Sequence, residues 1–440
     1  MDAMTFLEKR VASLDIDGYE IYRIRSRQLW IEAKDRQIES SQESEALGLA
    51  VQLFRRGQSG FASTSLDTEA FLERTVSLAY NSLDIVEAGI PRPLPSPAPW
   101  NGGADCDDGL RGRRFAEKAE RALALEAEAK AFDRRVTRVR GARYQEAEEA
   151  VELRNSRQLD ARYTRTLCEL SLMVMAEEKG GQEMAWESEF SPFFSELDPS
   201  RPARRAAGQA VSLLGARPIA TRKAPALLDP AVGASLLSVL ASSLLGDQVM
   251  KGKSVLKDKV GEKIYSEQVT LTDDGLLKGG YATAPFDGEG VPAQRTAVVS
   301  AGRLNGFLHD LTSAVRLEAA PTGNGVRPVY KEIPRTGVTN FFVEPGDASW
   351  DDLRRRMGEG FWITDLIGVH TANPVTGDFS LGASGFWLQG GEQRPVRGVA
   401  VSGNIHDLFR KTVGVGSELR FYHAYGCPPL LISEIEIGGV

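Results

Sequence analysis

The pattern of apolar residues changes about halfway along the 440-residue chain, and this change restricts the folds that the chain can adopt. Before residue 205, segments with the period of a helix are mixed with segments that have the period of a strand. After Pro225, short strand-like segments separated by glycine-containing turns predominate. The stretch Pro199–Arg205, rich in proline and arginine, predicts a break between the two parts. We therefore expect an α+β fold. An N-terminal α+β domain with an antiparallel sheet would span residues 1–205, and a β-rich, barrel-like domain with a few helices would span residues 220–440.

The N-terminal part predicts helices on either side of a group of strands. Apolar residues have helical spacing in Thr5–Leu14, in Glu69–Ser82 and in an alanine- and glutamate-rich segment between Arg113 and Phe132. Strand-like alternation covers Tyr19–Ile24, Gln28–Ala33, Ala46–Phe54, Gly60–Ser63 and parts of Val136–Glu187. Five prolines between Pro91 and Pro99, followed by small and acidic residues, indicate a connector near residues 91–109.

Beyond the predicted break, helical spacing is limited to a small helix at Ala206–Leu214 and one helix at residues 230–249. The remaining segments are short and strand-like, and turn signals such as Asp273-Asp274-Gly275 separate them. The expected strands are Glu267–Thr272, Gln294–Ser300, Arg303–His309, Thr339–Val343, Gly385–Gln389, Arg397–Val401 and Leu430–Ile437. This density of short strands predicts a barrel-like or strongly curved sheet.

Composition excludes several classes of function. Hydrophobic residues make up 42% and charged residues 26% of the chain, which is typical of a globular protein. A net charge of −7 leaves no broad basic surface for nucleic acid. No apolar run approaches the roughly 18 residues that a membrane span needs. Cys106, Cys168 and Cys427 lie far apart in the sequence, so neither a disulfide framework nor a zinc ribbon is indicated. We expect a cytoplasmic protein without nucleic-acid or membrane partners.

The stretch GDFSLGAS, Gly377–Ser384, is one residue away from a phosphate-binding loop. Ala383 stands where the lysine of that motif meets the phosphates, and the next residues are apolar and strand-like instead of opening a helix. Ser384 is also a poor nucleophile, because a nucleophile elbow needs a strand before the serine and a helix after it. A structural glycine turn is the better interpretation.

The four histidines, His309, His370, His406 and His423, all lie in the last third of the chain. His423 and Cys427 have a spacing compatible with a metal pair, but Gly426 and two prolines break any helix that would bring them together. His309 and His406 each precede an aspartate, and strand neighbours point to opposite faces. These residues are expected to be structural.

An acidic loop at Pro285–Thr296 is a weaker candidate for chemistry. Asp287 and Glu289 flank a turn that leads into a strand containing Arg295. Such carboxylates can act in general acid–base catalysis. A solvated turn is the commoner explanation of this pattern.

Several long segments together resemble the TldD/PmbA (TldE) family, once described as modulators of DNA gyrase and now grouped with metallopeptidases. The matching segments, in order, are GLAVQLFRRGQSGFASTS, PFDGEGVPAQRT, GRLNGFLHD, NPVTGDFSLGASGFW, NIHDLFRKTVGVGSEL and PPLLISEIEIGG, so the resemblance covers nearly the whole chain. In the PmbA/TldE branch, NPVTGDFSxGASGFW is a recurrent signature of the C-terminal domain. The resemblance implies that this stretch shapes the barrel and the groove beside it.

The resemblance also implies that this chain lacks a metal site. TldD chains carry H-E-x-x-x-H after a Leu-Leu pair; two histidines and a distant cysteine hold zinc, and the glutamate activates water. Matching Leu236-Leu237 to that pair places Ser238, Val239 and Ser243 at the motif positions. Serine hydroxyls do not replace imidazoles as zinc ligands. Cys427 also lies past the position of the zinc cysteine in TldD.

The chain is thus identified as a PmbA/TldE-type subunit, with no catalytic residue, metal or cofactor of its own. The expected partner is a TldD-type catalytic subunit that holds zinc, and the expected substrates of the complex are peptides. Two alternatives remain: a peptidase that is active alone through unconventional ligands, and a homodimeric peptide-binding module. Candidate residues for a peptide groove or chamber lining are Asp287, Glu289, Arg295, His309 and Ser384.

Overall fold

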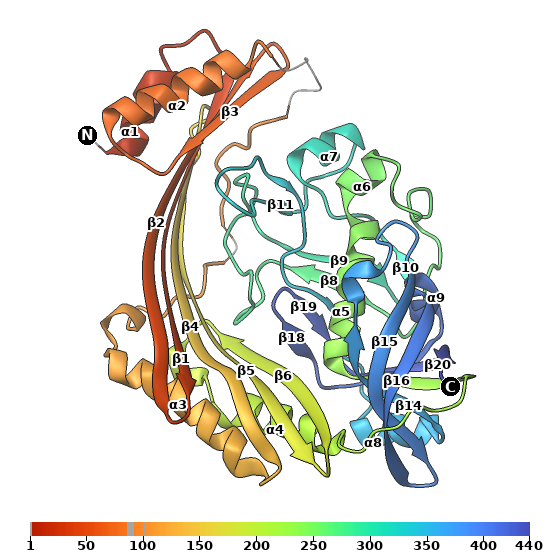
Figure 1. The fold of residues 1–440 in the computed structure, drawn as a ribbon. Coiled ribbons are helices and arrows are strands. Elements are labelled where there is room, and N and C mark those ends of the chain that lie inside the picture. The colour runs from red at the N-terminus through yellow and green to blue at the C-terminus, as the bar shows by residue number, and fades with distance from the viewer. Residues whose placement is uncertain (1, 86–91, 101) are drawn as a thin grey trace.

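One long, curved sheet forms the N-terminal part of the computed structural model, which describes residues 2–85, 92–100 and 102–440 (Figure 1). Its six antiparallel strands lie in the order β3-β2-β1-β4-β5-β6. They are β1 (Gly18–Lys34), β2 (Gln37–Arg55), β3 (Gln58–Thr64), β4 (Val136–Asn155), β5 (Asp160–Glu178) and β6 (Gly181–Ser191). The expected α+β class with an N-terminal antiparallel sheet is confirmed.

The two strands predicted at Tyr19–Ile24 and Gln28–Ala33 are one strand, β1. The polar residues between them, Arg25 to Arg27, pair with β2 on one side and with β4 on the other. Because a central strand has both edges bonded, a polar run of three residues does not interrupt it.

Two pairs of helices cover the sheet at opposite ends of its long strands (Figure 1). At one end, α1 (Ala3–Val11) and α2 (Glu69–Ser82) enclose a core that includes Leu7 and Val76. At the other end, α3 (Phe115–Phe132) and α4 (Ser200–Ser212) enclose a second core that includes Leu125. Each half of the sheet is therefore stabilised by its own apolar layer.

The predicted break at Pro199–Arg205 is wrong, because these residues begin helix α4. Pro202 lies in the first turn of the helix, where the missing N–H has no intrahelical partner to lose. A row of buried alanines, Ala203, Ala206, Ala207 and Ala210, packs into the core that α4 shares with α3. The division of the chain into domains at residues 205–220 stays a prediction.

The second half contains a closed barrel, which confirms the expected barrel-like region. Strands β16, β15, β14, β7 and β20 pair in this order, and β16 also pairs with β20 through Ala400 and Gly438. The strands are β7 (Arg222–Leu228), β14 (Gly360–Ile367), β15 (Asp378–Gln389), β16 (Glu392–Asn404) and β20 (Leu430–Gly438), with β17 (Thr412–Val415) beside β20. The stretch Gly377–Ser384 is therefore no glycine turn: only Gly377 has a positive φ, of 83°, and β15 starts at the next residue.

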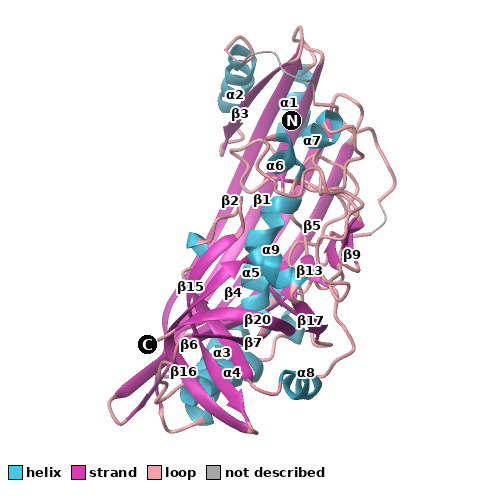
Figure 2. Ribbon diagram, turned by 90° about the vertical axis from the view of Figure 1, so that its right-hand side faces the viewer, coloured by secondary structure: helices cyan, strands magenta, loops and turns pink. Residues whose placement is uncertain are grey.

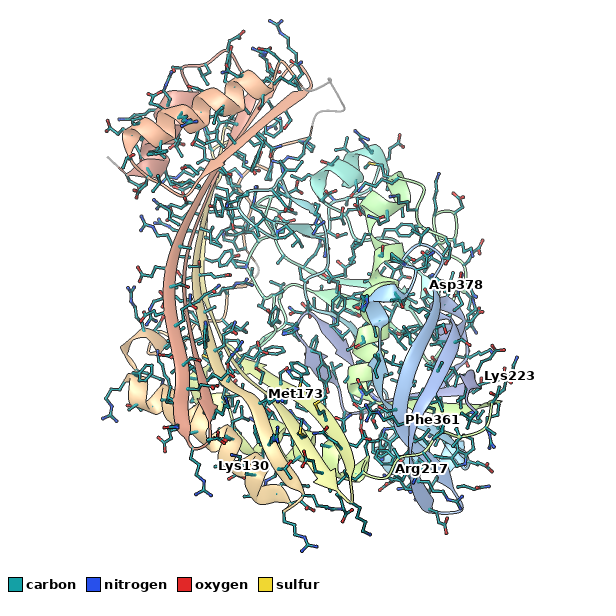
Figure 3. The ribbon with its side chains drawn as sticks, viewed as in Figure 1. Lys130, Met173, Arg217, Lys223, Phe361 and Asp378 are labelled. Carbon is teal, nitrogen blue, oxygen red and sulfur yellow. The ribbon has the colours of Figure 1, made fainter. Side chains whose placement is uncertain are left out.

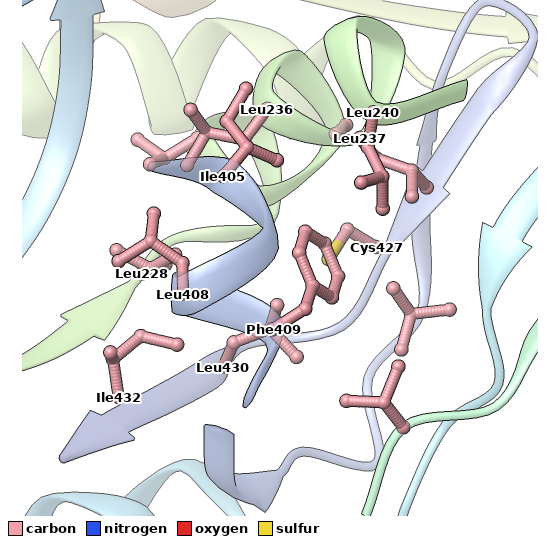
Figure 4. Packing of buried hydrophobic residues seen from close by; sticks show 14 of the residues in the cluster. Leu228, Leu236, Leu237, Leu240, Ile405, Leu408, Phe409, Cys427, Leu430 and Ile432 are labelled. Atoms are coloured by element: carbon pink, nitrogen blue, oxygen red, sulfur yellow. The ribbon is translucent and has the colours of Figure 1, made fainter. Parts of the chain in front are cut away.

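Helix α5 (Pro230–Ala241) packs between this barrel and a second six-stranded sheet (Figure 2). Three leucines of α5 share a core with three apolar residues of α9 (Ile405–Arg410) (Figure 4). They are Leu236, Leu237 and Leu240 of α5, and Ile405, Leu408 and Phe409 of α9. The second sheet consists of β10 (Arg303–Leu304), β9 (Arg295–Ser300), β8 (Leu271–Asp274), β13 (Phe341–Val343), β19 (Tyr425–Cys427) and β18 (Arg420–Tyr422). Several of these strands are shorter than predicted. The strand expected at Arg303–His309, for example, covers only Arg303 and Leu304.

The single helix predicted at residues 230–249 is interrupted. α5 is followed by a 3₁₀ turn at Ser242–Leu244, by Leu245 in an extended conformation, and by α6 (Gly246–Met250). The Gly246 N–H donates to the Leu308 carbonyl at 2.7 Å, which replaces the helical bond. A side chain at Gly246 would clash with the His309 ring. The remaining α-helices and strands of the described residues are α7 (Leu311–Arg316), α8 (Trp350–Met357), β11 (Gly325–Val326) and β12 (Arg335–Thr336).

The concave face of the first sheet packs against the second half around Phe286. The Phe286 ring lies 4.9 Å from Trp100 of the connector and 5.1 Å from Tyr163 of β5, measured between ring centroids. Gly48 of β2 leaves room for the ring of Tyr330, which a Cβ atom would overlap. No helix in the described residues is long and apolar enough to cross a membrane.

We expect Phe286→Ala to lower the free energy of unfolding by about 3–5 kcal/mol, because it leaves a cavity in the apolar junction of the two halves. Phe286 is only 1% exposed. Phe71→Ala, at a position that is 42% exposed on α2, is the control, with an expected loss of about 0.5 kcal/mol. Urea unfolding followed by circular dichroism measures both. Equal losses would show that Phe286 does not hold the halves together.

Candidate functional site

A cleft of about 870 Å³ lies between the two halves of the molecule. Strands β5 and β6 and helix α4 form one wall, and α5, β14 and the β18–β19 hairpin form the opposite side. Met173 of β5 marks the inner side of the first sheet, opposite the second half (Figure 3). Phe386 of β15 and Arg397 of β16 complete the lining, and because these segments lie far apart in the sequence, no short sequence motif identifies the cleft.

Large apolar side chains are unusually exposed along the cleft. Met173, Met184, Trp186 and Ile367 are 37%, 51%, 45% and 58% exposed, and all four line it. Exposed apolar side chains that gather at one place, instead of being scattered, are typical of an interaction site. The two methionines add flexible surface that adapts to different ligand shapes.

Arginines and carboxylates supply the polar part of the cleft. Arg205 pairs with Glu187 at 3.1 Å, and Arg397 of the barrel reaches Glu183 of β6 at 2.6 Å, which ties the two walls together. Burial raises the pKa of Glu187 above its usual value. Arg420 is different: within the described part of the chain its nearest ion-pair partner is the exposed Glu418, at 3.8 Å.

Helix α5 presents small side chains to the cleft. Asp229 caps the helix by accepting from the Ala231 N–H, and Pro230 occupies the first turn, where a missing N–H costs nothing. Ser235 and Ser238 line the cleft, and the Ser238 hydroxyl donates to the Ser235 carbonyl at 2.7 Å. Apart from Val232, helix α5 therefore presents only small side chains to the cleft, with the Asp229 carboxyl at its N-cap as the neighbouring charged group.

The three positions matched to the zinc motif face in different directions. Ser238 faces the cleft, whereas Val239 packs against the core of the second half. Ser243 is buried, with its hydroxyl 3.4 Å from Nε2 of His406. Nδ1 of His406 in turn lies 2.8 Å from the Tyr265 hydroxyl. Hydroxyl and methyl groups at these positions offer no ligand that suits zinc.

The donor chemistry around α5 does not fit a metal ion. Among the residues that the structure describes, no three His, Cys, Asp or Glu side chains gather to hold one. Cys427 packs its thiol against Gly233 of α5, and burial raises its pKa far above the usual value, so the thiol stays protonated.

The four histidines do not converge either. His309 is buried beside Ser313, at 3.3 Å, and burial lowers its pKa. His370 is exposed, His406 lies in the core, and His423 lines the cleft with Nε2 3.7 Å from Glu169.

The remaining sequence candidates lie outside the residues that line the cleft. Arg295 is on the second sheet, where it pairs with Glu344 at 2.5 Å and with Asp274 at 3.4 Å. Ser384 is buried in β15 at an irregularity of the pairing with β14. The residues that do line it, such as Trp186 and Arg420, belong to segments without a recognisable motif.

Glu289 is buried and Asp287 is partly buried, so the expectation of a solvated turn is wrong. The Asp287 carboxylate accepts from the backbone N–H groups of Gly325, Glu289 and Val291 at 2.7–3.0 Å. Burial raises the pKa of both carboxyls, to about 8 for Asp287. The acidic residues of this loop accept hydrogen bonds from backbone N–H groups and do not line the cleft.

Glu289 belongs to a buried ion network that joins the two halves. Arg92 of the connector donates to Glu289 at 2.7 Å and to Glu20 of β1 at 2.5 Å. Arg327 of the second half donates to Glu20 at 2.6 Å. All four side chains are at least nine-tenths buried. Each charge therefore depends on its partners in place of water.

Three family models cover most of the sequence: domain 1 of the PmbA/TldA metallopeptidases at residues 19–82, the central domain at 110–214 and the C-terminal domain at 221–439. The chain belongs to the PmbA/TldD family. Among its relatives, the metalloprotease PmbA of Escherichia coli O157:H7 is 27% identical over 98% of this chain and 94% of its own length.

Solved structures of PmbA/TldD relatives share the fold. TldE from Thermococcus kodakarensis superposes with a TM-score of 0.90 at 22% identity, over 99% of this chain and all of its own. A Thermotoga maritima protein described as a modulator of a DNA gyrase gives 0.91 at 24% identity, over 99% of both chains. The expected family membership is confirmed.

Removing the central cation of the buried network tests its contribution to stability. We expect Arg92→Met to lower the free energy of unfolding by about 3–5 kcal/mol, because Glu289 loses its ion-pair partner and Glu20 loses one of two. The control is Arg10→Met, which breaks a pair with Glu73 on the surface and should cost at most about 1 kcal/mol. Denaturant unfolding measures both. A loss for Arg92→Met as small as the control's would contradict the assigned role.

A second prediction concerns pH. Burial lowers the pKa of His406 from 6.5 to about 4. Between these pH values the imidazole is therefore protonated in the unfolded chain and neutral in the folded chain. The contribution of His406 to the free energy of unfolding is fully present above about pH 7. It falls by about 3 kcal/mol when the pH is lowered to about 4. In unfolding experiments at several pH values, His406→Gln should therefore have a shallower dependence than the parent. The exposed His370→Gln should follow the parent, and identical curves for all three would refute the assignment.

Proposed function

We propose that this chain is the subunit without a metal site in a heterodimeric peptidase of the PmbA/TldD family. The observation that supports this most directly is the cleft face of α5. Ser238 stands at a position where TldD chains are expected to carry a zinc ligand, and its hydroxyl is bonded to the backbone of its own helix. Ser243, at the other ligand position, contacts His406 in the core. Zinc would be held by a TldD-type partner, in the cytoplasm.

The proposed role of this chain is to form one wall of an enclosed chamber and to stabilise the catalytic partner. Resemblance to the family extends the proposal to the substrates, which would be unfolded peptides, including microcin precursors and antitoxins. The apolar rim of the cleft suits such substrates, since an unfolded peptide exposes the side chains that a folded protein buries. A chamber also limits access to extended chains.

A homodimeric peptide-binding module is the second candidate, and the same apolar cleft favours it. The two candidates differ in the partner. Light scattering of the purified chain, alone and mixed with a TldD-type chain, separates them. A one-to-one complex of this chain with the TldD-type chain supports the heterodimer. A homodimer that does not bind the TldD-type chain supports the peptide-binding module.

We expect the tag-free chain alone to bind no stoichiometric zinc and to cleave no peptide, and the mixture with a TldD-type chain to cleave. The triple variant Ser238→His, Val239→Glu, Ser243→His should also bind no zinc, because zinc needs three or four converging ligands and the third is missing. Elemental analysis and a casein digest with and without added zinc are the measurements. Stoichiometric zinc in the parent chain, with hydrolysis that a chelator abolishes, would establish it as a peptidase in its own right.

A further inference from the structure

We propose that the cleft of this chain binds the C-terminal end of a peptide, with the free carboxylate at Arg420 and a large apolar side chain among Met184, Trp186 and Ile367. The inference deepens the proposed role in peptide handling and rests on it. It assigns binding to the subunit that lacks the metal, at residues that no sequence motif identifies.

The first support is the position of Arg420. Its side chain lies on the same face of β18 as Tyr422, two residues on, and both line the cleft. The other cleft arginines have carboxylates of the protein at shorter range: Arg205 has Glu187 at 3.1 Å, and Arg397 has Glu183 at 2.6 Å. For Arg420 the only described ion pair within 4 Å is with Glu418 at 3.8 Å, which is itself 71% exposed, and the cleft carboxylates Asp229 and Glu187 act on Arg420 from beyond that distance. A guanidinium group without a close carboxylate partner in the protein is suited to bind the carboxylate of a ligand.

Charge complementarity is the second support. Four arginines line the cleft, against three carboxylates, in a chain whose net charge is −7. Glu187 is buried and Asp229 is partly buried, and burial raises the pKa of each carboxyl. Among the side chains that line the cleft, arginines therefore outnumber carboxylates, and Arg420 is the arginine whose nearest ion-pair carboxylate lies farthest away.

The third support is the apolar rim, which favours a ligand that carries an apolar group over a small inorganic anion. Met184, Trp186 and Ile367 are each about half exposed and line the same cleft as Arg420. Burying such surface against a ligand side chain stabilises a complex in proportion to the apolar area removed from water. The last residue of a peptide places one carboxylate directly beside one side chain, which matches an arginine without a close carboxylate partner beside an apolar surface.

Three fluorescein-labelled heptapeptides test the proposal on the full-length chain by fluorescence anisotropy. The first has a glycine-serine spacer and ends in Leu-Phe with a free carboxylate. The second is its C-terminal amide, and the third is an acid that ends in Ser-Ser. We expect the first to bind at least about tenfold more tightly than either of the others. Equal binding of acid and amide, or no binding of the Leu-Phe acid at millimolar concentration, would overturn the proposal.

Variants locate the site. Arg420→Gln should abolish the preference for acid over amide and keep the preference for Leu-Phe over Ser-Ser, whereas Trp186→Ala should weaken binding of both Leu-Phe peptides. The control is Arg394→Gln, on the exposed β15–β16 hairpin outside the cleft, which should change nothing. Circular dichroism melting confirms that each variant is folded. If Arg420→Gln fails to fold, Arg420→Lys takes its place and should weaken binding only of the Leu-Phe peptide with a free carboxylate. An unchanged acid preference in the folded Arg420 variant would refute the assignment.

An amidated peptide with aspartate next to Phe separates a C-terminal carboxylate from a side-chain carboxylate. Binding of this peptide as tight as that of the Leu-Phe acid would overturn the assignment to a free C-terminus. None of these outcomes depends on zinc content or on assembly with a TldD-type chain. A failed peptide test therefore leaves the proposed subunit role standing, and a failed assembly test leaves the peptide preference standing.

Discussion

The buried ion network around Arg92 fixes how the two halves of this molecule meet. Glu20 lies on the central strand of the first sheet, Arg92 on the connector, and Glu289 and Arg327 on loops of the second half. An apolar contact such as the one around Phe286 tolerates small shifts, whereas buried charges lose much of their stabilisation when the geometry changes. Since the walls of the cleft come from both halves, the shape of the cleft depends on this distant junction.

Helix α5 connects the core of the second half to the cleft. Its leucines pack against the barrel and against α9 (Figure 4). Ser235 and Ser238 of the same helix line the cleft. A helix that is buried on most sides cannot move without disturbing the core. It therefore holds the floor of the cleft in place whether the exposed positions carry metal ligands or serines.

Local patterns in the sequence predicted the elements whose structure depends on local interactions. Glu69–Ser82 was predicted as a helix and is α2, because its apolar spacing matches one buried face. The break at Pro199–Arg205 failed, since proline in a first helical turn is neutral and the buried alanines of α4 gave no strong apolar signal. Asp287 and Glu289 looked solvated because their partners, Gly325 and Arg92, lie far away in the sequence. The cleft residues were missed for the same reason: only the tertiary fold brings Trp186 and Arg420 together.

The strand order of the first sheet has a consequence for how the chain is made. β1 pairs with β2 and with β4, yet β4 begins more than a hundred residues after β1 ends. While the ribosome is still adding the connector and α3, the finished β1–β2–β3 meander presents the whole of β1 as an open edge. Such an edge is a template for pairing with a neighbouring nascent chain. The charged run of Arg23, Arg25 and Arg27 on β1 opposes that pairing, because two copies brought edge to edge would place like charges side by side.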